Sequence, residues 1–171
     1  MLCICGSKIE SKNCCSQFVS NNAIAQTPVA LMRSRYFAFA HSATDYLVSS
    51  HAQSTRTSAL AQELVDWCAV THWAKLVVHS FDEQNLSDSL EKNCFTDTQE
   101  QLPTVCFSAY YFYQNEFYVM KELSRFIVEQ GQWRYLDGES LEHINFGKIG
   151  LNKPCPCNSG NKFKRCCYKA R

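Results

Sequence analysis

Two short segments, one at each end of the chain, repeat the same arrangement of four cysteines. In both, a Cys-x-Cys pair is followed by eight residues and then by two adjacent cysteines. Side chains two apart in an extended segment point to one side, and adjacent ones diverge by only about 100° on a helical turn. The four thiols of each copy can therefore meet at one ion. The predicted metal ligands are Cys3, Cys5, Cys14 and Cys15 in the first copy and Cys155, Cys157, Cys166 and Cys167 in the second.

Four thiolates around one ion make a closed tetrahedral site, which is typical of structural zinc. We expect two Zn²⁺ ions per chain, with iron as the alternative because it also accepts four thiolates. The other reading of each copy is a pair of disulfides or free thiols. The first copy begins at residue 3, where we expect the chain to fray more.

The composition of the 171-residue chain favours metal ligands over disulfides. Hydrophobic residues make up 46% and charged residues 19%, which is enough for one domain with its own core. No apolar run approaches the roughly 20 residues that a bilayer needs, and no basic segment precedes an apolar one near the start. We therefore expect a cytoplasmic protein without a membrane partner, in which clustered thiols bind metal.

The charges are divided unevenly along the chain. Residues 16–143 hold eight Lys or Arg against fifteen Asp or Glu, whereas residues 144–171 hold seven basic residues and no acidic one. A basic tail on an acidic body predicts salt-sensitive association with carboxylates or phosphates. The residues predicted to contact such a partner are Lys162, Phe163, Lys164, Arg165 and Tyr168.

The middle of the chain reads as helices followed by strands. Thr27 and Pro28 are a favourable helix start, a break is expected near Ser42, and a second helix is expected from about residue 57 to 68. Short turns at residues 114–115 and around Gly131 indicate antiparallel hairpins, and the polar segment 82–101 an exposed loop. The predicted strands are His72–Phe81, Val105–Tyr113, Phe117–Glu129 and Trp133–Leu136.

This order predicts an α+β fold with the helices on one face of a curved antiparallel sheet. We expect three parts: a metal motif over residues 1–20, an α+β domain over 25–142 and a second metal motif over 150–171.

The segment from Lys153 to Cys167, KPCPCNSGNKFKRCC, resembles the SEC-C motif. That motif is a zinc-binding tail module also found at the end of the protein-translocation ATPase SecA. The resemblance implies zinc as the metal and an export chaperone or the ribosome as the kind of partner. The N-terminal copy keeps Gly6 and Ser7 but lacks the basic and aromatic residues before its closing pair, so it is the weaker match.

Further along the chain stand Leu31–Tyr36, Asp45–Leu47, Trp73, Glu122-x-Ser124-x-Phe126 and Gly131–Gly138. Together these segments resemble the YchJ family, which places a cone-like domain between SEC-C motifs. The resemblance implies a nuclear transport factor 2-like (cystatin-like) central domain, and the family carries no assigned biochemical activity.

One predicted strand face raises the possibility of chemistry inside the cone. Glu122 and Ser124 are the only polar members of a face that is otherwise apolar. A carboxylate in an apolar pocket is a candidate general base. The alternative, which we favour, is an ion pair between Glu122 and Arg33 or Arg35 of the first helix. The five histidines show no spacing typical of a metal site or a catalytic dyad.

Three functions remain open from the sequence. The leading hypothesis is a zinc-stabilised interaction module whose basic tail docks on an acidic protein or RNA, and which pairs as a homodimer through its sheet. The second is an enzyme or small-ligand binder that uses the cone around Glu122. The third is metal trafficking by exchangeable terminal sites.

Overall fold

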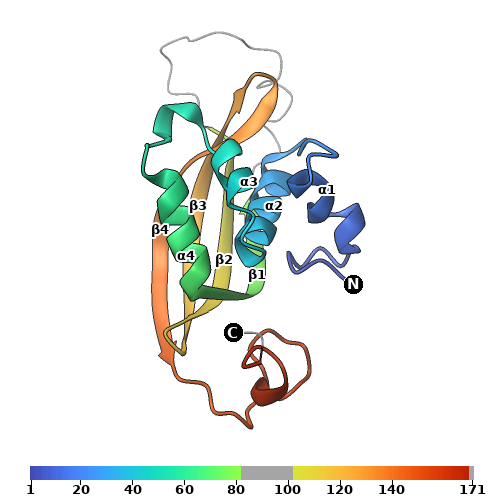
Figure 1. The fold of residues 1–171 in the computed structure, drawn as a ribbon, viewed down its shortest axis with the longest axis vertical. Helices are drawn as coiled ribbons and strands as arrows, with labels where there is room; N and C mark the ends of the chain where they lie inside the picture. Colours follow the sequence, from blue (N-terminus) through green and yellow to red (C-terminus); the bar gives the residue numbers. More distant parts are fainter. Residues whose placement is uncertain (82–101, 170–171) are drawn as a thin grey trace.

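A four-stranded antiparallel sheet with helices on one face forms the body of the protein (Figure 1). The computed structural model describes residues 1–81 and 102–169. The predicted α+β class is confirmed, whereas the predicted loop over 82–101 lies outside the described residues. The elements are η1 Ser11–Asn13, α1 Cys15–Val19, α2 Pro28–Ala40, α3 Thr44–Ser49, η2 Gln53–Thr55, α4 Leu60–Val70, β1 Thr71–Phe81, β2 Thr104–Tyr113, β3 Glu116–Glu129, β4 Gln132–Gly147 and η3 Phe163–Arg165.

Helix α2 begins where the sequence predicts it. The Thr27 hydroxyl accepts a hydrogen bond from the Ala30 amide at 3.1 Å, and Pro28 occupies the first turn, where no amide donor is needed. The predicted break is confirmed, because Ser42 has a left-handed backbone (φ 53°) between α2 and α3. The second predicted helix starts three residues later than expected, at Leu60, and has no side-chain cap.

The strands follow one another as a meander in the order β1-β2-β3-β4. Both predicted hairpin turns are confirmed: Gln114 and Asn115 have φ of 48° and 68°, and Gln130 and Gly131 have φ of 53° and 71°. Two successive left-handed residues are typical of a type I′ turn, whose twist matches that of the flanking strands.

The last strand is much longer than predicted. The sequence prediction ended at Leu136, but β4 runs on to Gly147 and pairs with β3 along its whole length, up to Phe117. Most of β4 beyond Leu136 is exposed, so its sequence carries little of the alternation that marks a half-buried strand. The extension exists because β3, at 14 residues, offers free backbone groups for that length.

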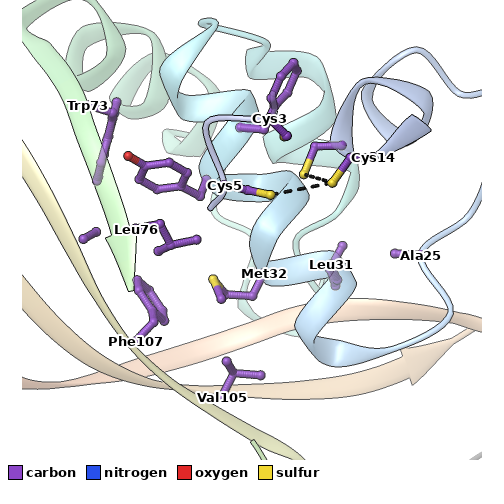
Figure 2. Close-up of a cluster of buried hydrophobic side chains, with 14 of the residues drawn as sticks. Cys3, Cys5, Cys14, Ala25, Leu31, Met32, Trp73, Leu76, Val105 and Phe107 are labelled. Carbon is purple, nitrogen blue, oxygen red and sulfur yellow. Dashed lines mark hydrogen bonds between the residues drawn. The ribbon is translucent and has the colours of Figure 1, made fainter. Parts of the chain in front are cut away.

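The main core lies between the sheet and helix α2, and it includes the N-terminal cysteines (Figure 2). Phe126 and Val105 are completely buried there, beside Leu31 and Met32 of α2. Figure 2 shows the sulfur atoms of Cys5 and Cys14 close to the same helix. The N-terminal motif is therefore part of the domain core and not a frayed end.

The C-terminal motif packs elsewhere. Its Phe163 is only 2% exposed and stacks on Phe112 of β2, with ring centroids 5.1 Å apart. Phe112 directly follows Tyr111 on β2, and Tyr111 belongs to the main core. Because neighbouring side chains on a strand point to opposite faces, Phe112 lies on the face of the sheet away from that core. None of the helices in the described ranges has the length and apolar character to cross a bilayer.

We expect Thr27→Ala to lower the free energy of unfolding by about 1 kcal/mol, because it removes the N-cap of α2. That corresponds to a fall of about 2–4 °C in melting temperature for a chain of this size. Differential scanning calorimetry measures it. Thr57→Ala is the matched control, because Thr57 is exposed and makes no side-chain cap. Equal melting temperatures for the two variants would contradict the assigned cap.

Candidate metal centres and a buried cavity

The two cysteine motifs share one backbone conformation. In both, the extended arms are joined by a short antiparallel bridge, between Leu2 and Glu10 in one copy and between Pro154 and Lys162 in the other. The backbone hydrogen bonds recur pair by pair: Cys3 N to Ile9 O and Cys155 N to Asn161 O, Gly6 N to Cys3 O and Asn158 N to Cys155 O, Ser11 N to Met1 O and Phe163 N to Lys153 O, Asn13 N to Glu10 O and Arg165 N to Lys162 O, Cys14 N to Ser11 O and Cys166 N to Phe163 O.

The same left-handed positions close both reversals. Gly6 and Asn158 follow the second cysteine of each copy with φ of 78° and 62°, and both residue types tolerate this conformation. The first cysteine of each adjacent pair also has an unusual backbone, with φ and ψ of −126° and −117° at Cys14 and −132° and −119° at Cys166. The adjacent thiols thus converge through this irregular residue, and not through a shared helical turn as predicted.

The structure brings together all eight predicted ligands in two groups of four. Within each group the sulfur atoms lie within 4.8 Å of one another, and no disulfide joins them. Cys5 and Cys14 sulfurs are 3.6 Å apart, and those of Cys157 and Cys166 are 3.4 Å apart. Zinc–sulfur bonds of about 2.3 Å in a tetrahedron require sulfur separations near ~3.8 Å. Each group can therefore hold a metal ion.

A serine hydroxyl supports each cluster at the same place. Ser7 lies 3.2 Å from the sulfur of Cys14, and Ser159 lies 3.1 Å from that of Cys166. Both serines stand two residues after the second cysteine, so the repeat extends to Cys-x-Cys-x-Ser. The sequence carried this signal, but we did not assign the serines a role. A hydroxyl that donates to a metal-bound thiolate orients the ligand and stabilises its charge.

The thiols influence one another's protonation. A hydrogen bond from Cys15, opposed by burial and aided by Ser7, lowers the pKa of Cys5 to about 4. The same hydrogen bond, together with burial, raises the pKa of Cys15. In the other cluster, burial alone would raise the pKa of Cys157. Hydrogen bonds from Ser159, Cys155 and Cys166 outweigh this effect and lower that pKa to about 7. Four adjacent thiolates need a cation to coexist, which agrees with a metal centre.

The two clusters differ in their surroundings. Arg33 of α2 donates a hydrogen bond to the Cys5 carbonyl, and Gly6 approaches β1 so closely that a Cβ atom would lie 3.3 Å from the Leu76 carbonyl. These contacts fix the N-terminal cluster against the domain core. In the C-terminal cluster Cys157 and Cys166 are partly exposed.

One of the five residues predicted to contact a partner is not available to it. Phe163 is buried against the sheet, because its ring anchors the C-terminal motif on Phe112. The other four are exposed at the surface: Lys162, Lys164, Arg165 and Tyr168.

A cavity of about 250 Å³ lies between the helices and the sheet, and Glu122 is in its wall. The prediction that Glu122 and Ser124 share the helix-facing side of β3 is confirmed, because both line this cavity together with Met120. Sequence reasoning missed His51 and Tyr135 in the wall, because one lies between α3 and η2 and the other on β4, where an isolated bridge joins them.

The ion pair that we favoured for Glu122 is wrong. Among the described residues neither arginine comes within 4 Å of a Glu122 oxygen. Arg33 is used by the Cys5 carbonyl, and Arg35 donates to the Leu47 carbonyl at 2.8 Å and to the Ser50 hydroxyl at 2.6 Å. The helix thus points its two arginines at backbone and hydroxyl acceptors, and within residues 1–81 and 102–169 no cation directly contacts Glu122.

Glu122 is instead held by hydroxyl groups. Its Oε1 accepts hydrogen bonds from Ser124 at 2.6 Å and Tyr135 at 3.2 Å. Gly138 of β4 makes room for this carboxyl group, because any Cβ atom at that position would overlap it. A glycine inside a strand often marks such a close approach, so Gly138 was a signal that the sequence offered.

Comparison with known proteins places these features in a family. The family described as "YchJ, middle NTF2-like domain" matches residues 27–138, which is more than half of the chain. The chain belongs to the YchJ family. Its C-terminal cysteines lie within a second match, to the SEC-C motif, over residues 152–169. The expected resemblance to both is therefore confirmed, and residues 1–15 of this YchJ-family chain repeat the backbone of its SEC-C motif.

Two solved structures share the fold. The solution structure of RPA3114, a SEC-C motif containing protein from Rhodopseudomonas palustris, is 25% identical, with a TM-score of 0.65 over 83% of this chain and 100% of that one. The crystal structure of a SEC-C motif containing protein from Psychrobacter arcticus is 22% identical, with a TM-score of 0.61 over 100% of this chain and 97% of that one. The second likeness supports the fold alone.

Corresponding substitutions in the two clusters should remove one metal ion each. We expect Cys15→Ser and Cys167→Ser to reduce the metal content from two ions per chain to one, measured by native mass spectrometry. Cys15 is 1% exposed within the main core, so its substitution should lower the melting temperature more than that of Cys167. Cys68→Ser, outside both clusters, is the control. Retention of two ions by either cluster variant would refute its ligand assignment.

Proposed function

We propose that both clusters hold Zn²⁺ as structural centres, and that the C-terminal motif presents a basic surface to an acidic protein partner. Four sulfurs complete a tetrahedral shell, so neither centre has an open position for a substrate. The apparent binding energy of such sites, about 10–16 kcal/mol in short peptides, is large enough to fold a segment that has no core of its own.

The difference between the two copies supports a docking role for the C-terminal one. In the N-terminal motif Lys12 forms an exposed ion pair with Glu10 at 3.3 Å, which neutralises its charge. At the position of Glu10 the C-terminal motif has Lys162, and at that of Lys12 it has Lys164. One scaffold therefore carries a less basic surface at one end of the chain, with Lys8 beside the Lys12–Glu10 pair, and a more basic surface at the other.

The C-terminal motif is also held rigidly enough to present this surface. Phe163 lies at the centre of the basic residues in sequence, and its burial on Phe112 ties η3 to the sheet. Lys162, Lys164 and Arg165 are exposed around this anchor. A zinc ion with four thiolates carries two negative charges, which leaves the segment 144–171 clearly positive. Such a surface attracts clustered carboxylates in a salt-dependent way.

The metal identity is tested on full-length protein purified without added metal. Inductively coupled plasma mass spectrometry should find two zinc ions per chain. Iron in their place would refute the zinc proposal.

The docking surface is tested by giving the C-terminal motif the charges of the N-terminal one. We expect Lys162→Glu/Arg165→Asn to weaken binding of a fluorescein-labelled deca-glutamate peptide by about tenfold at 50 mM NaCl, because two positive charges are lost and one negative charge is added. Fluorescence anisotropy measures the affinity, and native mass spectrometry checks that both metals remain.

Lys12→Glu is the matched control at the N-terminal copy and should leave binding unchanged. Equal affinities for the double variant and the parent protein would refute the basic docking surface. A ten-nucleotide uridine RNA is tested in the same way. If the parent protein binds this RNA and not the glutamate peptide, and the double variant binds the RNA more weakly, the partner is a nucleic acid and the acidic-protein proposal is wrong.

A further inference from the structure

The cavity between the helices and the sheet is not used by the proposed metal and docking functions. Its volume of about 250 Å³ exceeds the ~150 Å³ of an engineered cavity that binds benzene. Most of its wall is aromatic or aliphatic, whereas one side carries charged and hydroxyl groups. The apolar part of the wall includes Phe39, Trp67, Trp73, Phe107, Ala109 and Met120.

Arg35 supplies a buried positive charge to this wall. The side chain is 7% exposed, and its Nη1 is used by the Leu47 carbonyl and the Ser50 hydroxyl. Its Nε and Nη2 make no hydrogen bond to any described residue. Burial lowers the pKa of Arg35 to about 10, so the guanidinium is still charged at neutral pH.

The position of Arg35 is fixed by its neighbours. Its guanidinium lies 4.5 Å from the centre of the Tyr135 ring. Its acceptor Ser50 is itself tied to β4, because the Ser50 carbonyl accepts a hydrogen bond from the Tyr135 amide at 2.9 Å. The unused N–H groups of Arg35 therefore keep one orientation in the cavity wall, as a preorganised binding site requires.

Glu122 supplies the matching negative charge. Its Oε1 is occupied by the hydroxyls of Ser124 and Tyr135, whereas Oε2 accepts no hydrogen bond from a described residue. No direct ion pair joins Glu122 to Arg35 in the described part of the chain. The cavity wall thus carries a donor and an acceptor that both contact Tyr135, and described residues saturate neither of them.

Other polar atoms of the wall also lack partners. The buried Tyr36 hydroxyl, His51 Nδ1 and Trp73 Nε1 make no hydrogen bond within the described ranges, and all three residues line the cavity. A buried polar atom without a partner costs about 1–3 kcal/mol. Three residues of the cavity wall thus carry a buried polar atom that no described residue satisfies.

We propose that this cavity binds a small uncharged molecule with a flat apolar body and an amide-like edge. The carbonyl of that edge accepts hydrogen bonds from Arg35 Nε or Nη2, and its N–H donates to Glu122 Oε2. The apolar body lies among the rings of Trp73, Phe39 and Phe107. This binding is independent of both metal centres.

The charges of the wall select against other ligand classes. Arg35 and Glu122 balance each other, so a carboxylate ligand meets the repulsion of Glu122 and an amine meets that of Arg35. A purely apolar ligand would displace water from Arg35 and Glu122 without replacing the hydrogen bonds of that water. The free energy of desolvating the two groups then opposes binding. An edge that offers one acceptor and one donor satisfies both groups at once.

Benzamide is the probe, because it is the smallest aromatic amide of this description. We expect it to bind the full-length, metal-loaded protein with a Kd of about 0.1–1 mM, as befits so few atoms. Benzoate, which differs by one charge, should bind at least tenfold more weakly. Two-dimensional ¹H–¹⁵N NMR titrations measure both affinities and map the shifted residues.

The decisive variant is Glu122→Gln, which removes the negative charge and keeps the shape. It should shift the ratio of benzoate to benzamide affinity at least tenfold towards benzoate, because Arg35 is then unbalanced. Glu142→Gln is the control, since Glu142 is exposed on β4 and outside the cavity wall. An unchanged ratio in Glu122→Gln would overturn the proposal, as would the absence of saturable benzamide binding to the parent protein.

A second variant locates the site if Glu122→Gln fails to fold. Ala109 lies in the cavity wall and is 1% exposed. Ala109→Leu should fill the space and reduce benzamide affinity at least tenfold, with the melting temperature recording that the domain remains folded. Benzamide binding of parental affinity by a folded Ala109→Leu variant would show that the ligand binds elsewhere, and the proposal would be wrong.

Discussion

The convergence of four sulfur atoms at each end of the chain is the constraint on which the architecture depends. Neither terminal segment has enough apolar residues to form a core, and their extended arms are joined only by a single bridge and a few backbone hydrogen bonds. The clusters can hold ions, and an ion that draws four thiolates together determines the path of the chain between them. The left-handed residues and the irregular backbone of Cys14 and Cys166 then follow as geometric consequences.

The same scaffold lies in two different surroundings. The N-terminal cluster is buried in the main core beside α2, where Arg33 binds its backbone, so it acts as part of the domain. The C-terminal cluster packs on the sheet through Phe163, Cys155 and Cys167 and leaves its basic side chains in solvent. The substitution of Lys162 for Glu10 at equivalent positions changes the surface without changing the fold, since neither side chain takes part in the sulfur cluster.

The sequence predicted the elements whose signals are local. The cap of α2, the two hairpin turns and the grouping of the cysteines depend on residues close together in the chain, and all were found where expected. The end of β4 was missed because its exposed residues carry no apolar pattern, and its strand state comes from pairing with β3. The predictions for Phe163 and Arg35 were wrong because the contacts of each side chain depend on a distant element. Phe163 packs on β2, and Arg35 donates hydrogen bonds to the end of α3 and to the following residue, Ser50.

The arrangement of Arg35 and Glu122 is not one that stability alone would favour. The buried charge of Arg35 carries a desolvation penalty, and replacement of buried charged groups by apolar residues of similar volume is often neutral or stabilising. Here the two groups do not form a direct pair, and Gly138 leaves room for the carboxyl group at the expense of strand propensity. Backbone, hydroxyl and aromatic contacts hold both groups at the edge of an unfilled space. Polar groups that a stable core would not need are found at functional sites, and the wall of this cavity combines fixed side chains with polar atoms that no described residue satisfies.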